Sequence, residues 1–126
     1  MSEQGVGSRP VAAGATELLT PARFEEELRR AARFHRGLPI GDPLAAAVRR
    51  IENSPAFAQS RLLTRILAAL TYQQGEFRRA EVAALDSETL AMVITLMDVR
   101  AAGTSPQKDW VRAVDAARVA ELGAAG

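Results

Sequence analysis

The sequence predicts an all-α protein, a compact bundle of about five helices in one domain. Three observations lead to this prediction. Apolar residues recur at helical spacing along most of the chain. Alanine, the residue most favourable to helix, occurs 25 times. No segment alternates apolar and polar residues over a useful length, so we expect no strands.

A short polar residue followed by proline recurs four times along the chain, at Thr20-Pro21, Asp42-Pro43, Ser54-Pro55 and Ser105-Pro106. A Ser, Thr or Asp side chain before a helix accepts a hydrogen bond from a free N–H of the first turn. Proline suits the next position because it has the required φ and lacks an N–H that would stay unpaired. Each dipeptide therefore predicts the start of a helix.

The first two helices are expected over 21–36 and 43–52. The first ends before Gly37, and its Glu25 stands four residues before Arg29, a spacing that allows an ion pair on the helix surface. One stripe of the first helix contains Phe24, Leu28, Ala31, Ala32 and His35. The inward face of the second contains Leu44, Val48 and Ile51.

The third helix is expected over 55–74, with Gly75 as its C-terminal cap. Its apolar stripe is formed by Leu62, Leu63, Ile66, Leu67 and Leu70. This stripe is too wide for a helix with a single neighbour. We therefore expect the third helix at the centre of the bundle, in contact with the helices expected over 87–102 and 106–122.

The rest of the chain predicts a short helical turn over 78–85 and two further helices, over 87–102 and 106–122. Asp86 or Ser87 is expected to cap the helix over 87–102, and Gly103 to end it. Its inward residues are Leu90, Val93, Ile94 and Met97, and those of the last helix are Trp110, Val114, Ala117 and Leu122. The single helical domain then covers 16–122, between a flexible tail over 1–15 and a frayed end over 123–126.

Composition narrows the classes of function. The chain has 126 residues, a formal net charge of +1, no cysteine and no apolar run near the ~20 residues of a membrane span. Its first residues lack the apolar core of a signal peptide. We expect a cytoplasmic protein without a membrane segment, a disulfide, a metal or a cofactor.

Catalytic signals are sparse. His35 is the single histidine, and no nucleophile or orienting group is placed with it, so an enzyme based on His35 is the third hypothesis. The acidic run over 25–27 spreads around a helix and faces arginines, which suits a solvated ion-paired surface better than a metal site. No glycine-rich phosphate loop occurs.

Charge is unevenly distributed. Residues 49–79 contain six arginines against two glutamates, whereas 80–126 carries a net negative charge. Arg61 and Arg65 are i,i+4 neighbours, and with Arg78 and Arg79 they could form an anion-binding or partner-binding patch. The other interpretation is that the acidic C-terminal helices neutralise this basic segment, within one chain or across a dimer.

A helix-turn-helix interpretation would place the start of the helix over 87–102 in the major groove of DNA. Ser87, Glu88, Thr89 and Ala91 would then face the bases. A carboxylate and small groups suit that groove poorly, because guanine is read by Arg or Lys. DNA contact would instead use the arginines of 49–79 and the phosphates.

The segment 59–86 resembles an uncharacterised bacterial family, a domain of unknown function often carried on mobile or accessory elements. The shared positions are Gln59-Ser60-Arg61, Leu67-Ala68, Gly75 with Phe77, and Leu85-Asp86. Alanine or leucine stands where the family pattern has tryptophans, and the later aromatic segment is reduced to Trp110. The resemblance implies a bacterial accessory protein and no particular activity.

These observations favour a non-enzymatic protein that binds another protein, or a second copy of itself as a homodimer, through a helical face. The alternative is a nucleic-acid-associated accessory protein that contacts phosphates through Arg61, Arg65, Arg78 and Arg79.

Overall fold

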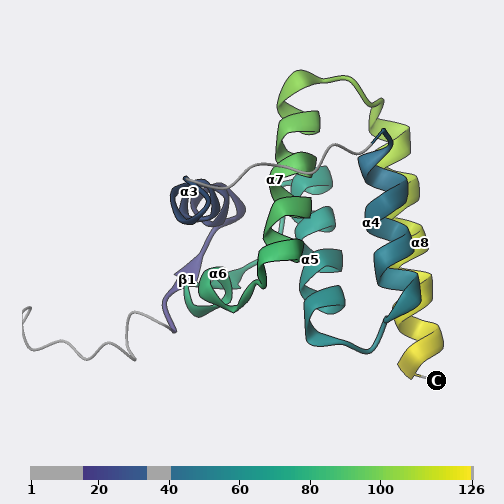
Figure 1. Cartoon of the computed structure of the whole chain (residues 1–126), viewed down its shortest axis with the longest axis horizontal. Helices are drawn as coiled ribbons and strands as arrows, with labels where there is room; N and C mark the ends of the chain where they lie inside the picture. Colours follow the sequence, from purple (N-terminus) through teal and green to yellow (C-terminus); the bar gives the residue numbers. More distant parts are fainter. Residues whose placement is uncertain (1–15, 34–40, 126) are drawn as a thin grey trace, which may run out of the picture.

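The predicted all-α class is confirmed by the computed structural model, which describes residues 16–33 and 41–125 (Figure 1). The predicted tail over 1–15 and His35 lie outside the described residues. The elements are β1 (Leu18–Leu19), α3 (Pro21–Ala31), α4 (Pro43–Asn53), α5 (Ala58–Tyr72), β2 (Phe77–Arg78), α6 (Ala80–Ala84), α7 (Ser87–Ala102) and α8 (Gln107–Ala125).

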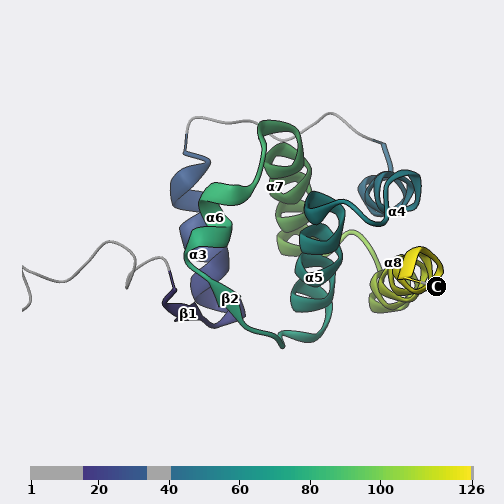
Figure 2. The same cartoon turned by 90° about the horizontal axis from the view of Figure 1, so that it is seen from below.

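The helices form three layers (Figure 2). In the middle layer, α5 and α7 pack against each other. Helices α4 and α8 run side by side in the same direction on one flank of this pair. Helix α3, with α6 and the two short strands, covers the other flank and packs against α7.

Three of the expected N-terminal caps are present. The Oγ1 of Thr20 accepts a hydrogen bond from the Arg23 N–H at 3.2 Å, and the Oδ1 of Asp42 accepts one from Ala45 at 3.2 Å. Asp86 Oδ1 accepts from the Thr89 N–H at 2.7 Å and so caps α7. These bonds satisfy N–H groups that a helix cannot pair within itself, which explains why each helix begins directly after its capping residue.

The prediction for the third helix is wrong at both ends. Ser54 is the C-cap of α4, and the Phe57 N–H donates to the Ser54 carbonyl at 3.1 Å, so Ser54-Pro55 forms a turn and α5 begins only at Ala58. At the other end the C-cap is Gln73, in the left-handed conformation with φ 56°, and Gly75, which also has a positive φ of 116°, lies beyond the cap. Gly103 does end α7 as expected, with φ 66°.

Two other helix ends differ from the expectation. Helix α3 ends at Ala31, which is exposed, while Phe24, Leu28 and Ala32 of the same predicted stripe are buried. Helix α8 continues to Ala125 instead of ending near 122. Its Leu122 is 72% exposed, so the prediction that this side chain faces inward is wrong.

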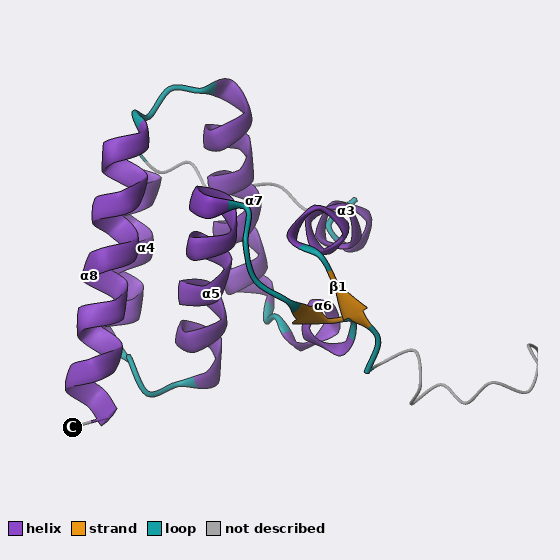
Figure 3. Ribbon diagram, turned by 180° about the vertical axis from the view of Figure 1, so that it is seen from behind, coloured by secondary structure: helices purple, strands orange, loops and turns teal. Residues whose placement is uncertain are grey.

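The short antiparallel sheet contradicts the expectation of no strands. Leu18 pairs with Arg78 and Leu19 with Phe77 (Figure 3). Strands of two residues are too short to show an alternating pattern, so the sequence carries no sign of them. The sheet places Phe77 against Phe24, where the two rings stack with centroids 4.0 Å apart.

The predicted central position of the third helix is confirmed. Helix α5 packs against α4, α7 and α8. Leu63 and Leu67 are 0% exposed and Ile66 is 2% exposed. Full burial of each such side chain contributes about 1.5–3 kcal/mol, so this helix is a major source of packing free energy.

We therefore expect Leu67→Asp to unfold the domain. The substitution places an unpaired carboxylate in a fully buried site, and its cost approaches the typical net stability of ~5–15 kcal/mol. Circular dichroism during heating measures the loss of helix. Ala58→Asp, at an exposed position in the first turn of the same helix, is the control and should melt at or slightly above the wild-type temperature, because a carboxylate there faces the positive end of the helix dipole. A cooperative melt of Leu67→Asp at the wild-type temperature would contradict the central position of α5.

Candidate functional site

The four arginines of the predicted patch have different surroundings. Arg65 of α5 forms an ion pair with Glu81 and donates to the Glu76 carbonyl at 2.8 Å. Its guanidinium carbon also lies 4.9 Å from the centre of the Phe77 ring, which allows a cation–π contact. Arg65 therefore joins α5 to β2 and α6 and does not point freely into solvent.

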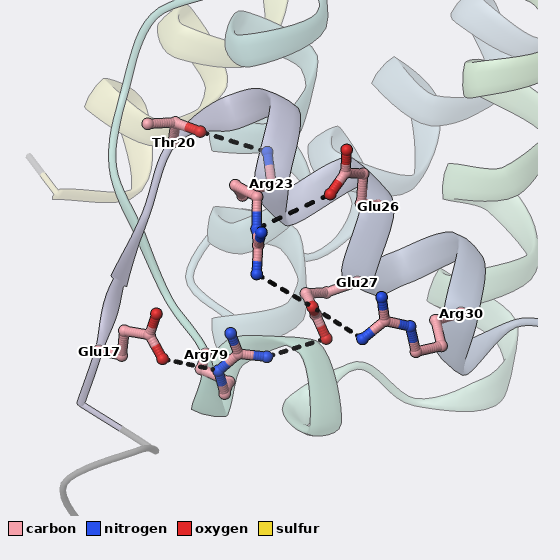
Figure 4. Close-up of polar contacts among 7 residues, drawn as sticks. All are labelled: Glu17, Thr20, Arg23, Glu26, Glu27, Arg30 and Arg79. Atoms are coloured by element: carbon pink, nitrogen blue, oxygen red, sulfur yellow. Dashed lines mark hydrogen bonds and ion pairs between the residues drawn. The ribbon is translucent and has the colours of Figure 1, made fainter.

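Arg79, the residue before α6, pairs with Glu17, the residue before β1, and with Glu27 of α3 (Figure 4). Its Nε lies 3.1 Å from an oxygen of Glu17, and its Nη1 lies 2.9 Å from an oxygen of Glu27. Glu27 is 8% exposed and also meets Arg30 at 3.2 Å and Arg23 at 3.9 Å. The hydrogen bonds from Arg79 lower the pKa of Glu17, and those to Glu17 and Glu27 raise the pKa of Arg79.

Arg61 and Arg78 have exposed side chains, and neither forms an ion pair with another of the described residues. Arg78 and Arg65 line one shallow hollow together with Glu76 and Glu81. The four arginines therefore do not form one continuous patch. Two arginines border a hollow that also contains carboxylates, and Arg79 contacts α3.

Three of the six arginines of the basic segment, Arg50, Arg65 and Arg79, form ion pairs, and none of these pairs involves a described residue of the last helix. Arg50 pairs with Glu88 and lies 3.7 Å from Asp86, while Arg65 pairs with Glu81. The remaining partners, Glu17 and Glu27, come from the N-terminal part of the chain. Opposite charges therefore meet within one chain, around α6 and the start of α7.

Glu25 and Arg29 are both described and do not form the expected ion pair with each other. Glu25 instead accepts a hydrogen bond from Arg100 at 2.8 Å, and Arg29 lies 3.3 Å from Asp98. Both contacts join α3 to α7. The i,i+4 spacing made a local pair possible, but the packing of α3 on α7 offers each side chain a partner on the other helix.

The start of α7 lies against α4. Arg50 Nη2 donates to the Thr89 hydroxyl at 2.9 Å, and Thr89 is 0% exposed. Glu88 is held by the same arginine. Of the residues that a helix-turn-helix would direct at bases, one is therefore buried and a second is ion-paired within the protein.

The described part of the chain contains no group of three His, Asp or Glu side chains that could hold a metal ion. Within the same residues, no helix is both long and apolar enough to cross a membrane.

A feature that the sequence did not indicate is an open groove of about 490 Å³ between α4 and α8. Its floor consists of small or aliphatic side chains, Leu44, Ala45, Val48, Ala113 and Ala116. Its rims carry charged residues, Asp42, Arg49, Glu52, Asp109 and Arg112. Alanine is so frequent in this chain that alanines with a special position cannot be recognised from the sequence.

Comparisons of the chain with protein-family models, with curated proteins and with solved structures find no match.

We expect Glu27→Gln to destabilise the protein by about 1–2 kcal/mol, because it removes the carboxylate that Arg23, Arg30 and Arg79 share in a nearly buried position. Urea unfolding gives the difference. Glu26→Gln is the matched control, because Glu26 is exposed and pairs with Arg23 alone among the described residues. Its effect should stay within about 0.5 kcal/mol. Equal effects of the two substitutions would show that the shared carboxylate has no special weight.

Stability should also depend on acid pH. The hydrogen bond from the Thr89 N–H outweighs the opposing effect of burial and, together with the Thr89 hydroxyl and the charge of Arg50, lowers the pKa of Asp86 from the ordinary 3.8. Burial raises the pKa of Glu81, but hydrogen bonds from Arg65 and from the Arg78 N–H outweigh it, so that this pKa lies below the ordinary 4.5. In the acid range the unfolded chain binds more protons than the folded one. The stabilisation is therefore complete above these ordinary values and is lost as the pH falls through the lower, folded values.

Urea unfolding at about pH 7 and about pH 3 tests this dependence. Asp86→Asn keeps a capping oxygen but cannot titrate, so it should cost about 0.5 kcal/mol at neutral pH and lose less stability in acid. Asp115→Asn, an exposed substitution on α8, is the control. An acid-induced loss in Asp86→Asn as large as that of the wild type would contradict the role of this carboxylate.

Proposed function

We propose that this protein is a non-enzymatic interaction module that binds an amphipathic helix of a partner protein in the groove between α4 and α8. The observation that carries the proposal is the groove itself, with its apolar floor between two charged rims. Amphipathic helices bind by laying an apolar stripe into such grooves.

The floor suits a third helix. Ala45, Ala113 and Ala116 have small side chains, so the backbone of a docked helix can approach closely. Val48 is half-buried at the same place, which leaves apolar surface for a partner to cover. Covering this surface would add a third helix to the pair formed by α4 and α8.

The rims supply charge complementarity. Helices α4 and α8 run in the same direction (Figure 1). Asp42 is the N-cap of α4 and Asp109 lies in the first turn of α8, while Arg49 follows Asp42 by about two turns and Arg112 follows Asp109 by about one turn. Arg49 has no ion pair among the described residues. Arg112 is 77% exposed and weakly paired, because its guanidinium lies as far as 4.0 Å from the Asp109 carboxylate. A fitting helix therefore carries a basic residue at one end of its apolar stripe and an acidic residue one to two turns away, on the order of 5–10 Å.

A synthetic peptide tests the proposal. It has about four turns, an apolar stripe at i, i+3, i+4 and i+7, and a lysine and a glutamate about two turns apart. We expect fluorescence anisotropy to show saturable binding, about tenfold tighter than that of a peptide with glutamine at both charged positions. Ala116→Trp should abolish binding because the ring fills the groove. Val119→Trp, on the solvent-exposed face of α8, is the matched control.

The other outcomes either overturn this proposal or favour another one. Absence of saturable binding at about 1 mM peptide, or equal binding by Ala116→Trp, would overturn the groove as the docking site. Light scattering that shows a dimer dissociated by Ala116→Trp would identify the occupant as a second copy. Affinity for duplex DNA that falls steeply with salt, and is weakened by Arg61→Gln and Arg78→Gln, would favour the nucleic-acid alternative.

A further inference from the structure

The N-terminus of α5 lacks the acceptor that caps α3, α4 and α7. Phe57 occupies the N-cap position, and no side chain accepts a hydrogen bond there. The first bond of the helix runs from the Arg61 N–H to the Phe57 carbonyl. The backbone N–H groups of Ala58, Gln59 and Ser60 therefore form no hydrogen bond within the described part of the chain. Such groups, together with the helix dipole, attract negatively charged acceptors.

A second observation lies at the same place. Ser60 is 3% exposed and lines a hollow of about 520 Å³ at this helix end. No other described residue forms a hydrogen bond with its hydroxyl. Leaving a buried hydroxyl unpaired costs about 1–3 kcal/mol, so a buried polar group normally has a partner. The hydroxyl of Ser60 is thus a buried donor without an acceptor, in the wall of a hollow.

The charges around the hollow limit what it can bind. Arg49 and Arg50 both line it, but Arg50 is already paired with Glu88 and with Asp86, which lines the hollow too. Arg49 is exposed and forms no ion pair with any other described residue. One available guanidinium next to one carboxylate suits a ligand with a single negative charge. A doubly charged phosphate would be repelled by Asp86 at close range.

We propose that this hollow binds a carboxylate group. One carboxylate oxygen accepts from the free N–H groups at the start of α5 and from the Ser60 hydroxyl, and the other faces the Arg49 guanidinium. The ligand would supply from outside the capping oxygen that Asp42 and Asp86 supply to their own helices. This site is distinct from the groove between α4 and α8, although Arg49 borders both.

An NMR titration with sodium acetate at constant ionic strength tests the proposal. We expect the amide signals of Ala58, Gln59 and Ser60 to shift saturably with acetate. Ser60→Ala should weaken acetate binding about threefold to tenfold, because one hydrogen bond to a charged group is lost. Arg112→Gln, on the rim of the other groove, should leave acetate binding unchanged. Tighter binding of a short peptide with a free C-terminus than of its amidated form would identify the end of a peptide chain as a source of the carboxylate.

Two substitutions at the cap give a sharper test that does not depend on Ser60. Phe57→Asp supplies a carboxylate from the chain itself, so it should raise the melting temperature by a few degrees and abolish the response to acetate. Phe57→Ala leaves the N–H groups uncapped and should keep the response. Equal responses of these two variants, undiminished acetate binding by Ser60→Ala, or identical shifts with chloride would overturn the proposal. Tighter binding of phosphate than of acetate would overturn the choice of carboxylate.

Discussion

Burial of α5 on three sides is the constraint on which the rest of this structure depends. Ile66 and Leu67 point in directions that one neighbouring helix cannot cover, so α4, α7 and α8 must all pack around this helix. The chain meets this requirement by placing α5 and α7 in the middle and α4 with α8 on one flank. The groove between α4 and α8 is a consequence of this arrangement, because two parallel helices packed on a third leave their outer seam uncovered.

Ion pairs decide which charges remain available at the surface. Glu27 gathers Arg23, Arg30 and Arg79 at a nearly buried point, and Glu81 holds Arg65. These contacts join segments far apart in the sequence, so their arginines serve the fold before they can serve a ligand. The cations left without an ion pair among the described residues include Arg49, Arg61 and Arg78, and Arg49 borders both of the hollows for which we propose ligands.

The sequence predicts helices well where local chemistry decides their ends, and poorly where tertiary contacts do. Thr20, Asp42 and Asp86 cap helices as their residue types predict. Ser54 has the same signal but ends α4 instead, because the preceding helix continues up to it. The candidate site was less predictable: the partners of Arg65 and Arg79 depend on the packing of α6 and α3, which no spacing in the sequence encodes. The uncapped start of α5 became visible only once the helix was known to begin at Ala58.

The outer layer of α3, α6 and the two strands has a consequence for motion. Its aromatic pair, Phe24 with Phe77, is internal to the layer. Polar contacts of Glu25 with Arg100 and of Arg29 with Asp98 border its junction with α7. Salt weakens the exposed pair of Arg29 with Asp98, and to a smaller extent the partly buried pair of Glu25 with Arg100, but leaves aliphatic packing intact. This layer is therefore suited to open as a cooperative unit while α4, α5, α7 and α8 stay folded, so that its amides exchange hydrogen for deuterium sooner than those of α5.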